Sequence, residues 1–256
     1  MKVGPLTRFK VTVGYDGTNY SGWQLQPDKC TVQGQMERAL FELSGQEIRL
    51  HSSGRTDRGV HARAQVVHFD LASDIHPDKL VVGMNRFLQH DIRVLKATRA
   101  KPDFDARMSA TGKEYRYFIW NERHMPPHLR LYNTHIYRPL DLARMQEAAA
   151  HLVGRHDFAS FSANPGHERE GTERTIYALK WMKKGSQYTL IARGDGFLFK
   201  MVRSLAGFMI RVGVGDLNAH DAVTILNSKT RTARVPTAHP QGLFLWQVYY
   251  GKVPSL

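Results

Sequence analysis

Cysteine and acidic residues are scarce in this sequence of 256 residues. The single cysteine, Cys30, excludes an internal disulfide framework and a multi-cysteine zinc site, and it favours a reducing compartment. Asp and Glu together number 23 against 36 for Lys and Arg, so the formal net charge is +13. This excess of positive charge is typical of proteins that bind nucleic acid. The composition therefore predicts a polyanionic partner without indicating any chemistry.

Long apolar runs are absent as well. No stretch has the length of a signal peptide or a membrane span, so we expect a cytoplasmic protein with no membrane partner. The 13 histidines form no cluster with the spacing of a zinc site, and we therefore expect no metal. Apolar residues make up 42% of the chain, which is typical of a globular protein, and the length favours two domains.

The hydrophobic pattern predicts strands and helices that alternate in two similar halves. In the first helix, Thr31 is the expected N-cap and Gly45 the expected stop. Strands are predicted at residues 9–17, 47–53, 64–70, 91–100, 113–121, 175–194 (a hairpin turning at Lys184 and Gly185) and 242–250. Helices are predicted at residues 31–45, 77–88, 141–154, 197–213 and 219–228. This order predicts an α+β fold of two domains, residues 1–107 and 108–256, each a mainly antiparallel sheet with helices on one face.

The stretch HSSGRTDRGVHA, residues 51–62, holds one acid, Asp57, between Arg55 and Arg58 on a connection between two predicted strands. Opposite charges nearby favour the ionised carboxylate, so we expect an anion that acts as a nucleophile, a base or a positioning group. The arginines can equally bind phosphates through bidentate hydrogen bonds. The alternative is a charged hairpin tip whose exposed ion pairs contribute little.

Arg203 and Tyr115 are two further candidates. Arg203 lies in a predicted helix that is apolar nearly all round, and a charge on such a buried helix needs a partner, for which Asp57 is a candidate. The alternative is an arginine that reaches the surface at the edge of the helix. Tyr115 lies in a predicted strand, where a tyrosine is most often a core residue, although an aromatic ring in an RNA-binding cleft can stack on a base.

The segment GRTDRGVHA resembles the GRTD-x-GVHA signature of the TruA family of tRNA pseudouridine synthases. Further segments resemble the family in the same order and over almost the whole chain: YDGTNYSGWQLQP, TVQGQMERAL, FDARMSATGKEYRY, DFASF, FLFKMVRSLAG and QGLFLWQVYY. Two departures from the family pattern are Arg58, where many members carry a small residue, and Gln89, where a proline is expected. Neither touches the implied catalytic residues.

The resemblance implies that Asp57 is the catalytic aspartate, that Tyr115 packs on the target base and that Arg203 pairs with the aspartate. It further implies a homodimer of two-domain α+β subunits whose sheets join into one long sheet, with a basic cleft between the domains. The implied substrate is tRNA, at uridines 38 to 40 of the anticodon arm, and the reaction requires no metal or organic cofactor. We expect Arg55 and Arg58 to hold RNA phosphates.

Two other functions are compatible with a basic α+β protein. A binding module would hold RNA by its sheet and charge without chemistry, but such a protein gains nothing from an anion such as Asp57 in its RNA groove. A glycosylase that uses an aspartate would leave an abasic site, whereas an isomerase leaves the mass of the RNA unchanged. Whether Asp57 attacks the sugar or removes a proton from it stays open at the level of sequence.

Overall fold

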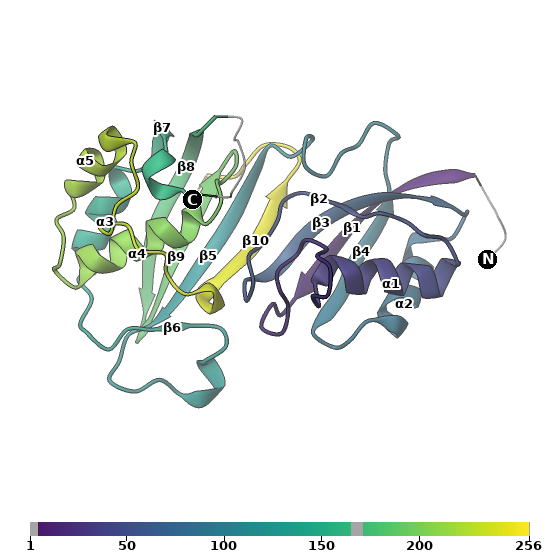
Figure 1. The fold of residues 1–256 in the computed structure, drawn as a ribbon, viewed down its shortest axis with the longest axis horizontal. Coiled ribbons are helices and arrows are strands. Elements are labelled where there is room, and N and C mark those ends of the chain that lie inside the picture. The colour runs from purple at the N-terminus through teal and green to yellow at the C-terminus, as the bar shows by residue number, and fades with distance from the viewer. Residues whose placement is uncertain (1–4, 165–170, 256) are drawn as a thin grey trace. The chain divides into compact units, whose positions relative to one another are not determined.

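The computed structural model describes residues 5–164 and 171–255. The chain divides into two compact units, of which the first comprises Met1–Thr111 and Leu245–Lys252 and the second Gly112–Phe244 and Val253–Leu256. Each unit combines a mainly antiparallel sheet with helices (Figure 1), which confirms the α+β class predicted from the sequence. The boundary predicted between residues 107 and 108 concerns domains that fold independently of each other, and it stays a prediction. Among the described residues, no helix is both long and apolar enough to cross a lipid bilayer.

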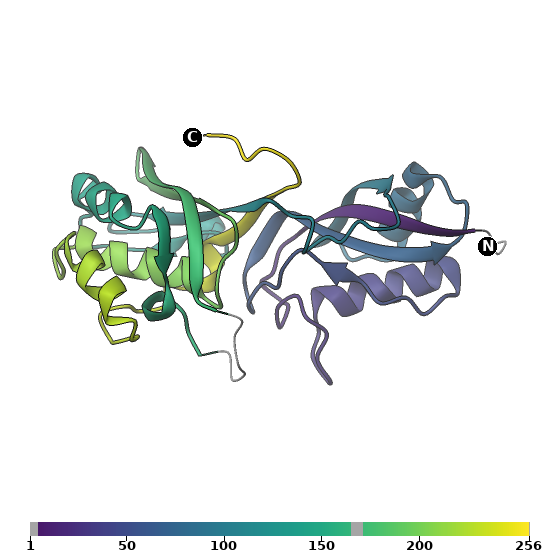
Figure 2. The same cartoon turned by 90° about the horizontal axis from the view of Figure 1, so that it is seen from above.

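The first unit is a sheet with the strand order β4-β1-β3-β10, in which the short strand β2 also pairs with β3. The pairs of β1 with β3 and β4, and of β2 with β3, are antiparallel. Figure 2 shows α1 lying along one face of this sheet. The elements are β1 (Leu6–Tyr15), α1 (Val32–Ser44), β2 (His51–Ser52), β3 (His61–Ala72), α2 (Pro77–Phe87), β4 (Ile92–Arg99) and β10 (Leu243–Tyr249).

Local sequence signals account for the boundaries of α1. The Thr31 side chain accepts a hydrogen bond from the backbone N–H of Gly34 and so caps the N-terminus. Gly45 ends the helix with a positive φ of 70°, and its N–H donates to the carbonyl of Phe41. Both predictions for this helix are therefore confirmed.

The second unit has the strand order β5-β9-β8-β7, with β6 paired parallel to β5. Helix α3 packs against α4 and β8. The elements are β5 (Gly112–Trp120), β6 (Thr134–His135), α3 (Leu142–Ala150), β7 (Gly154–Asp157), β8 (Glu173–Lys184), β9 (Gln187–Gly194), α4 (Met201–Gly213) and α5 (Asp221–Ser228), with short 3-10 helices at Pro127–Leu129, Ala159–Phe161 and Pro240–Gly242.

Three expectations about local structure are wrong. The strand predicted at residues 47–53 is reduced to β2, because side chains of α1 bind the backbone of Leu50: its N–H donates to the Glu37 carboxylate and its carbonyl accepts from Gln33. The helix predicted from residue 197 begins only at Met201, after Lys200 adopts a left-handed φ of 58°. The hairpin turns at residues 185 and 186, since Lys184 pairs with Gln187. The short strands β6 and β7 are not anticipated by the pattern.

A buried ion-pair cluster stabilises the second unit beside Tyr115. The Glu114 carboxylate is 2% exposed and accepts hydrogen bonds of 2.7 Å from Nε of Arg116 and of 2.7 Å from Nε of Arg193. Arg193 also donates to the carbonyls of Pro254 and Ser255. The cluster therefore fixes β5, β9 and the C-terminal segment to one another through one carboxylate.

We expect Glu114→Gln to destabilise the protein by about 3 kcal/mol or more, because the substitution leaves a buried arginine without its counter-charge. The measurement is the midpoint and slope of urea unfolding. The matched control is Glu173→Gln, which removes an ion pair with Arg155 whose side chains are 63% and 72% exposed, and should leave the midpoint unchanged. Equal shifts of the urea midpoint in the two variants would contradict the stabilising role of the Glu114 cluster.

Candidate active site

The Asp57 motif connects β2 to β3, and burial alternates along it in a way that suits a reactive carboxylate. Thr56 and Val60 are buried at 7% and 2% exposure, and Asp57 between them is half-buried. Arg55 and Arg58 are exposed. The main chain therefore lies against the core, while the Asp57 side chain is at the border between protein and solvent.

Hydrogen bonds to β1 and to residues 16–31 fix the backbone on both sides of Asp57. The Thr56 hydroxyl forms a 2.8 Å hydrogen bond with the Tyr15 hydroxyl, and the Thr56 carbonyl accepts from the N–H of Trp23 at 3.1 Å. Burial raises the pKa of Tyr15, so its hydroxyl stays protonated. The Val60 N–H donates to the Asp57 carbonyl at 3.1 Å and closes a turn. Asp57 thus sits on a main chain with little freedom to move.

A buried glutamine secures the start of the same loop. Gln65 of β3 is fully buried, and its side-chain oxygen accepts a 2.6 Å hydrogen bond from the Ser53 hydroxyl. Its Nε2 donates to the Gly54 carbonyl at 2.8 Å, and the Ser53 N–H donates to the Val66 carbonyl. The polar groups of this loop are therefore satisfied inside the protein, as burial requires. Nothing in the sequence pattern identifies Gln65 as the residue that does this.

Two glycines in residues 16–31 allow this segment to pass directly over the Asp57 loop. A Cβ atom on Gly17 would lie 2.0 Å from the Val60 carbonyl oxygen. At Gly22, which has a φ of 95°, it would lie 2.7 Å from the Thr56 carbonyl oxygen and 3.2 Å from the carbonyl carbon of Asp57. Both positions exclude any side chain, because two backbones are in contact there.

Tyr115 lies in β5 of the second unit, opposite Ala192 of β9, and is 8% exposed. The edge of its ring contacts Phe197, with ring centroids 5.3 Å apart and an interplanar angle of 83°. This T-shaped contact sets the orientation of the tyrosine ring. Phe197 was expected to belong to the helix, whereas it lies in the connection that precedes α4.

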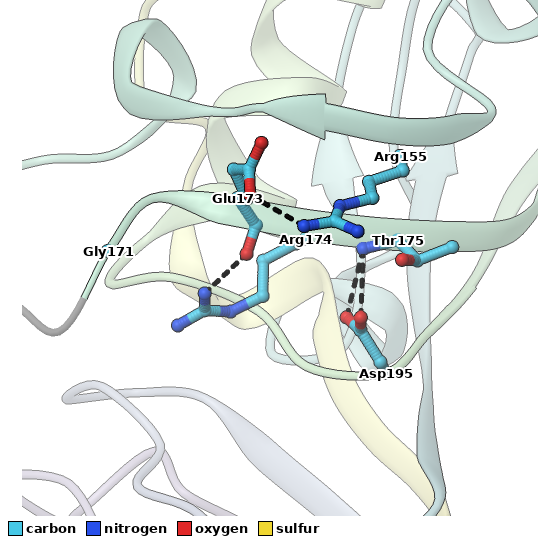
Figure 3. Close-up of a pocket in the computed structure, with 6 residues that line it drawn as sticks. All are labelled: Arg155, Gly171, Glu173, Arg174, Thr175 and Asp195. Carbon is cyan, nitrogen blue, oxygen red and sulfur yellow. Dashed lines mark hydrogen bonds and ion pairs between the residues drawn. The ribbon is translucent and has the colours of Figure 1, made fainter.

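Asp195 fixes the turn that carries Phe197. Figure 3 shows its carboxylate directed at the backbone nitrogen of Thr175, which donates to both carboxylate oxygens at 3.0 and 3.1 Å. These residues line a hollow of about 370 Å³ together with Arg155, Glu173 and Arg174. Since Arg155 binds the Glu173 carboxylate and Asp195 contributes a second negative charge, the hollow holds balanced charges. It is consequently a poor site for an RNA phosphate.

Arg203 belongs to the first turn of α4, where ten residues of the helix are buried, as the sequence predicts. Its Nε donates to the carbonyl of Ala238 at 2.7 Å, and the Ala238 N–H donates back to the Arg203 carbonyl at 3.0 Å. The guanidinium is thus held by a backbone carbonyl. Its pairing with Asp57 stays a prediction, since the two residues belong to different units. The roles of Arg55 and Arg58 also stay predictions.

The described part of the chain contains no group of three or more His, Cys, Asp or Glu side chains that could hold a metal ion. The first unit has the Asp57 carboxylate on a fixed loop, and the second unit has the oriented Tyr115 ring and the anchored Arg203 guanidinium.

Comparison with known proteins decides the family. The family model described as tRNA pseudouridine synthase matches residues 11–108 and 148–251, which include Asp57 and Arg203 but not Tyr115. This chain belongs to the tRNA pseudouridine synthase family. The enzyme is therefore an isomerase that acts on uridine in tRNA.

Relatives of this synthase match nearly its whole length. Proteins named tRNA pseudouridine synthase A from Oceanobacillus iheyensis and Bacillus subtilis are 43% and 42% identical to it, over 96% and 95% of this chain and 97% and 99% of theirs. The relative from Brevibacillus brevis is 41% identical over 96% of this chain and all of its own. A solved structure of a Cbf5-Nop10-Gar1 complex is 12% identical with a TM-score of 0.33 over 78% of this chain and 54% of the matched chain, a value too low to support any inference.

We expect Gly22→Ala to reduce turnover by about a hundredfold although it removes no functional group. The added Cβ would push against the carbonyl oxygen of Thr56 and displace Asp57, and a displacement of about 1 Å can cost that factor. The measurement is the single-turnover rate on tRNA. The control is Gly45→Ala, which has a similar positive φ but nothing within 4 Å of the new Cβ. Equal losses of the single-turnover rate in both variants would mean that backbone strain alone causes the effect.

Proposed function

We propose that this synthase converts uridines to pseudouridine at positions 38 to 40 of the anticodon stem-loop, with Asp57 as the catalytic carboxylate. The observation that carries the proposal is the half-buried Asp57 on a backbone fixed at Thr56 and Val60. A group that must meet one atom of a flipped nucleotide needs such a fixed position, because misplacement by an ångström costs much of the rate. The position within tRNA rests on the resemblance of the GRTDRGVHA segment to the TruA family.

The reaction breaks the bond between N1 of uracil and C1′ of the ribose and forms a bond between C5 and C1′. The uracil turns while it stays bound, C5 loses a proton and N1 gains one, so the composition of the RNA does not change. Asp57 serves either as a nucleophile toward the sugar or as a base that removes a proton from it. Both roles require the ionised carboxylate.

Tyr115 and Arg203 act on the base and on the carboxylate in this proposal. The Tyr115 ring, oriented by Phe197, packs on the target uracil as it turns. Arg203 pairs with Asp57 and orients its carboxylate during the reaction. The anchoring of Nε by the Ala238 carbonyl supports this role, since it fixes the plane of the guanidinium group.

The RNA must be held strongly enough to offset the cost of extruding the target nucleotide, which is a few kcal/mol. The net charge of +13 favours binding to the phosphate backbone. Arg55 and Arg58 are exposed and close to Asp57 in the chain, which supports their proposed binding to RNA phosphates. A protein with this substrate and no membrane-spanning helix among its described residues is proposed to work in the cytoplasm without an organic cofactor or a metal.

We expect Asp57→Asn to lose at least a factor of about a hundred in tritium release from an anticodon-arm tRNA labelled at C5 of uracil, because asparagine can be neither nucleophile nor base. The control Asp74→Asn replaces an exposed aspartate of the same unit and should leave release unchanged. The mass of the RNA should be unchanged after reaction.

Four results would contradict parts of the proposal. Full release by Asp57→Asn would remove this residue from the chemistry. Release that persists when uridines 38 to 40 are all replaced by cytidine would exclude the proposed position. Binding without release from any tRNA would favour the binding module, and an abasic product would favour a glycosylase.

We further propose that the enzyme is a homodimer that buries an aromatic cluster of the second unit, formed by Phe118, Phe244 and Tyr132. Tyr115 and Tyr117 are buried on one face of β5, so Phe118 lies on the opposite face. There its ring contacts Phe244 at 5.3 Å between centroids, and Tyr132, which is 39% exposed, lies 6.3 Å from Phe244. Exposed aromatic clusters of this kind are typical of protein interfaces.

We expect light scattering after gel filtration to give twice the chain mass of 29.2 kDa. Tyr132→Asp should shift the protein toward the monomer, because it places a charge in an apolar contact. Val82→Asp, which changes a 71% exposed side chain on α2, should leave the mass unchanged. A wild-type protein that is monomeric at micromolar concentration would contradict the proposal.

A further inference from the structure

Arg231 is a half-buried cation in the coil that follows α5, and none of the groups described above includes it. Its Nη1 donates to the Ser204 hydroxyl at 2.7 Å. Its Nη2 donates to the Val235 carbonyl and to the Thr237 hydroxyl, both at 2.8 Å. In the part of the chain that the structure describes, no carboxylate lies within ion-pair distance of this guanidinium. All three acceptors are neutral oxygens.

A half-buried charge in this position costs free energy of folding. We therefore expect it to have a role that a neutral residue cannot fill. Burial without a counter-charge lowers the pKa of Arg231, which marks the cost of removing the guanidinium from water. Glu114, in the same unit, shows the other arrangement, in which one carboxylate compensates two arginines. What Arg231 provides in return is a planar fork that reaches three oxygens on two separate segments at once.

The two segments joined by Arg231 are those that hold Arg203. Ser204 directly follows Arg203 in α4, while Val235 and Thr237 precede Ala238, the residue that binds Arg203 through both its N–H and its carbonyl.

The coil lies directly on the helix, because a Cβ atom on Gly207 of α4 would be 2.2 Å from the Pro236 carbonyl oxygen. The coil has no regular secondary structure between Ser228 and Pro240, so no repeating backbone ladder holds it in place.

We propose that Arg231 is a positioning residue for tRNA pseudouridylation: it clamps residues 235–238 onto α4 so that the Ala238 carbonyl sets the orientation of the Arg203 guanidinium. The inference rests on the role proposed for Arg203. A loosened clamp lets the Ala238 carbonyl move, and the guanidinium then no longer presents a fixed face to its partner. The expected effect falls on the chemical step, since Arg231 acts through the Ala238 carbonyl and Arg203.

The test is a double-mutant cycle of Arg231→Lys and Arg203→Lys in the full-length protein, with tritium release from anticodon-arm tRNA as the assay. Lysine keeps the positive charge but cannot bridge two segments with a planar fork. We expect Arg231→Lys to lower kcat about tenfold with KM unchanged, because a small misplacement of a catalytic group costs rate. In the Arg203→Lys background the same change should lower kcat by less than about twofold, since residues that act as a unit are not additive.

Arg234→Lys is the matched control. It lies on the same coil and binds a carboxylate, that of Asp221 at 2.6 Å, in place of the three neutral oxygens. It should leave kcat unchanged. If Arg231→Lys fails to fold, Ser204→Ala and Thr237→Val each remove one bond of the clamp and should lower kcat by a smaller factor, with KM again unchanged.

The outcomes separate this inference from the function it rests on. Unchanged kcat in Arg203→Lys would contradict the proposed role of Arg203 itself. If Arg203→Lys lowers kcat, but Arg231→Lys lowers kcat by the same factor with and without Arg203→Lys, the positioning role of Arg231 is overturned. The proposed role of Arg203 then stands. A rise in KM without a fall in kcat would overturn it in favour of direct contact with RNA.

Discussion

Contact between two backbones determines the position of the loop that carries the Asp57 carboxylate. Gly17 and Gly22 bring residues 16–31 so close to the Asp57 loop that a single methyl group at either position would collide with carbonyl atoms. The Thr56 carbonyl then accepts from Trp23, and Val32, the first residue of α1, donates to the Gly22 carbonyl. The ends of β1 and β2 and the starts of α1 and β3 therefore meet around one loop. A carboxylate on such a loop has its position determined by the core of the unit, which is the condition for action on a single atom.

Charge has two distinct functions in the second unit. Glu114 is compensated by Arg116 and Arg193, and this group joins strands and the C-terminal segment without reaching any substrate. Arg203 and Arg231, by contrast, bind carbonyl and hydroxyl oxygens around the start of α4. These neutral acceptors hold both arginines in place at the start of α4.

The sequence predicts most elements because hydrophobic period and capping act locally. Thr31 and Gly45 bound α1 as expected, and the apolar surface of α4 predicts its burial. The errors occur where a distant residue overrides the local pattern. Residues 47–50 have strand-like composition, yet the side chains of Glu37 and Gln33 in α1 bind the backbone N–H and carbonyl of Leu50. The region before Met201 has helical periodicity, yet the left-handed backbone conformation of Lys200 prevents the helix from beginning earlier. Neither competing interaction is visible in a window of neighbouring residues.

For the site, the sequence by itself determined the candidate residues: the motif around Asp57 and the cation on an apolar helix stand out by residue type and context, whereas Tyr115 becomes a candidate only through the family resemblance. Only the tertiary structure decided which contacts hold these side chains in position. Gln65 behind the loop, Phe197 against Tyr115 and the Ala238 carbonyl on Arg203 are contacts between residues far apart in the chain. Functional groups are selected for their own chemistry and leave a local signature. Supporting contacts depend on how segments pack, and many residue types could supply them, so no single position in the sequence reveals them.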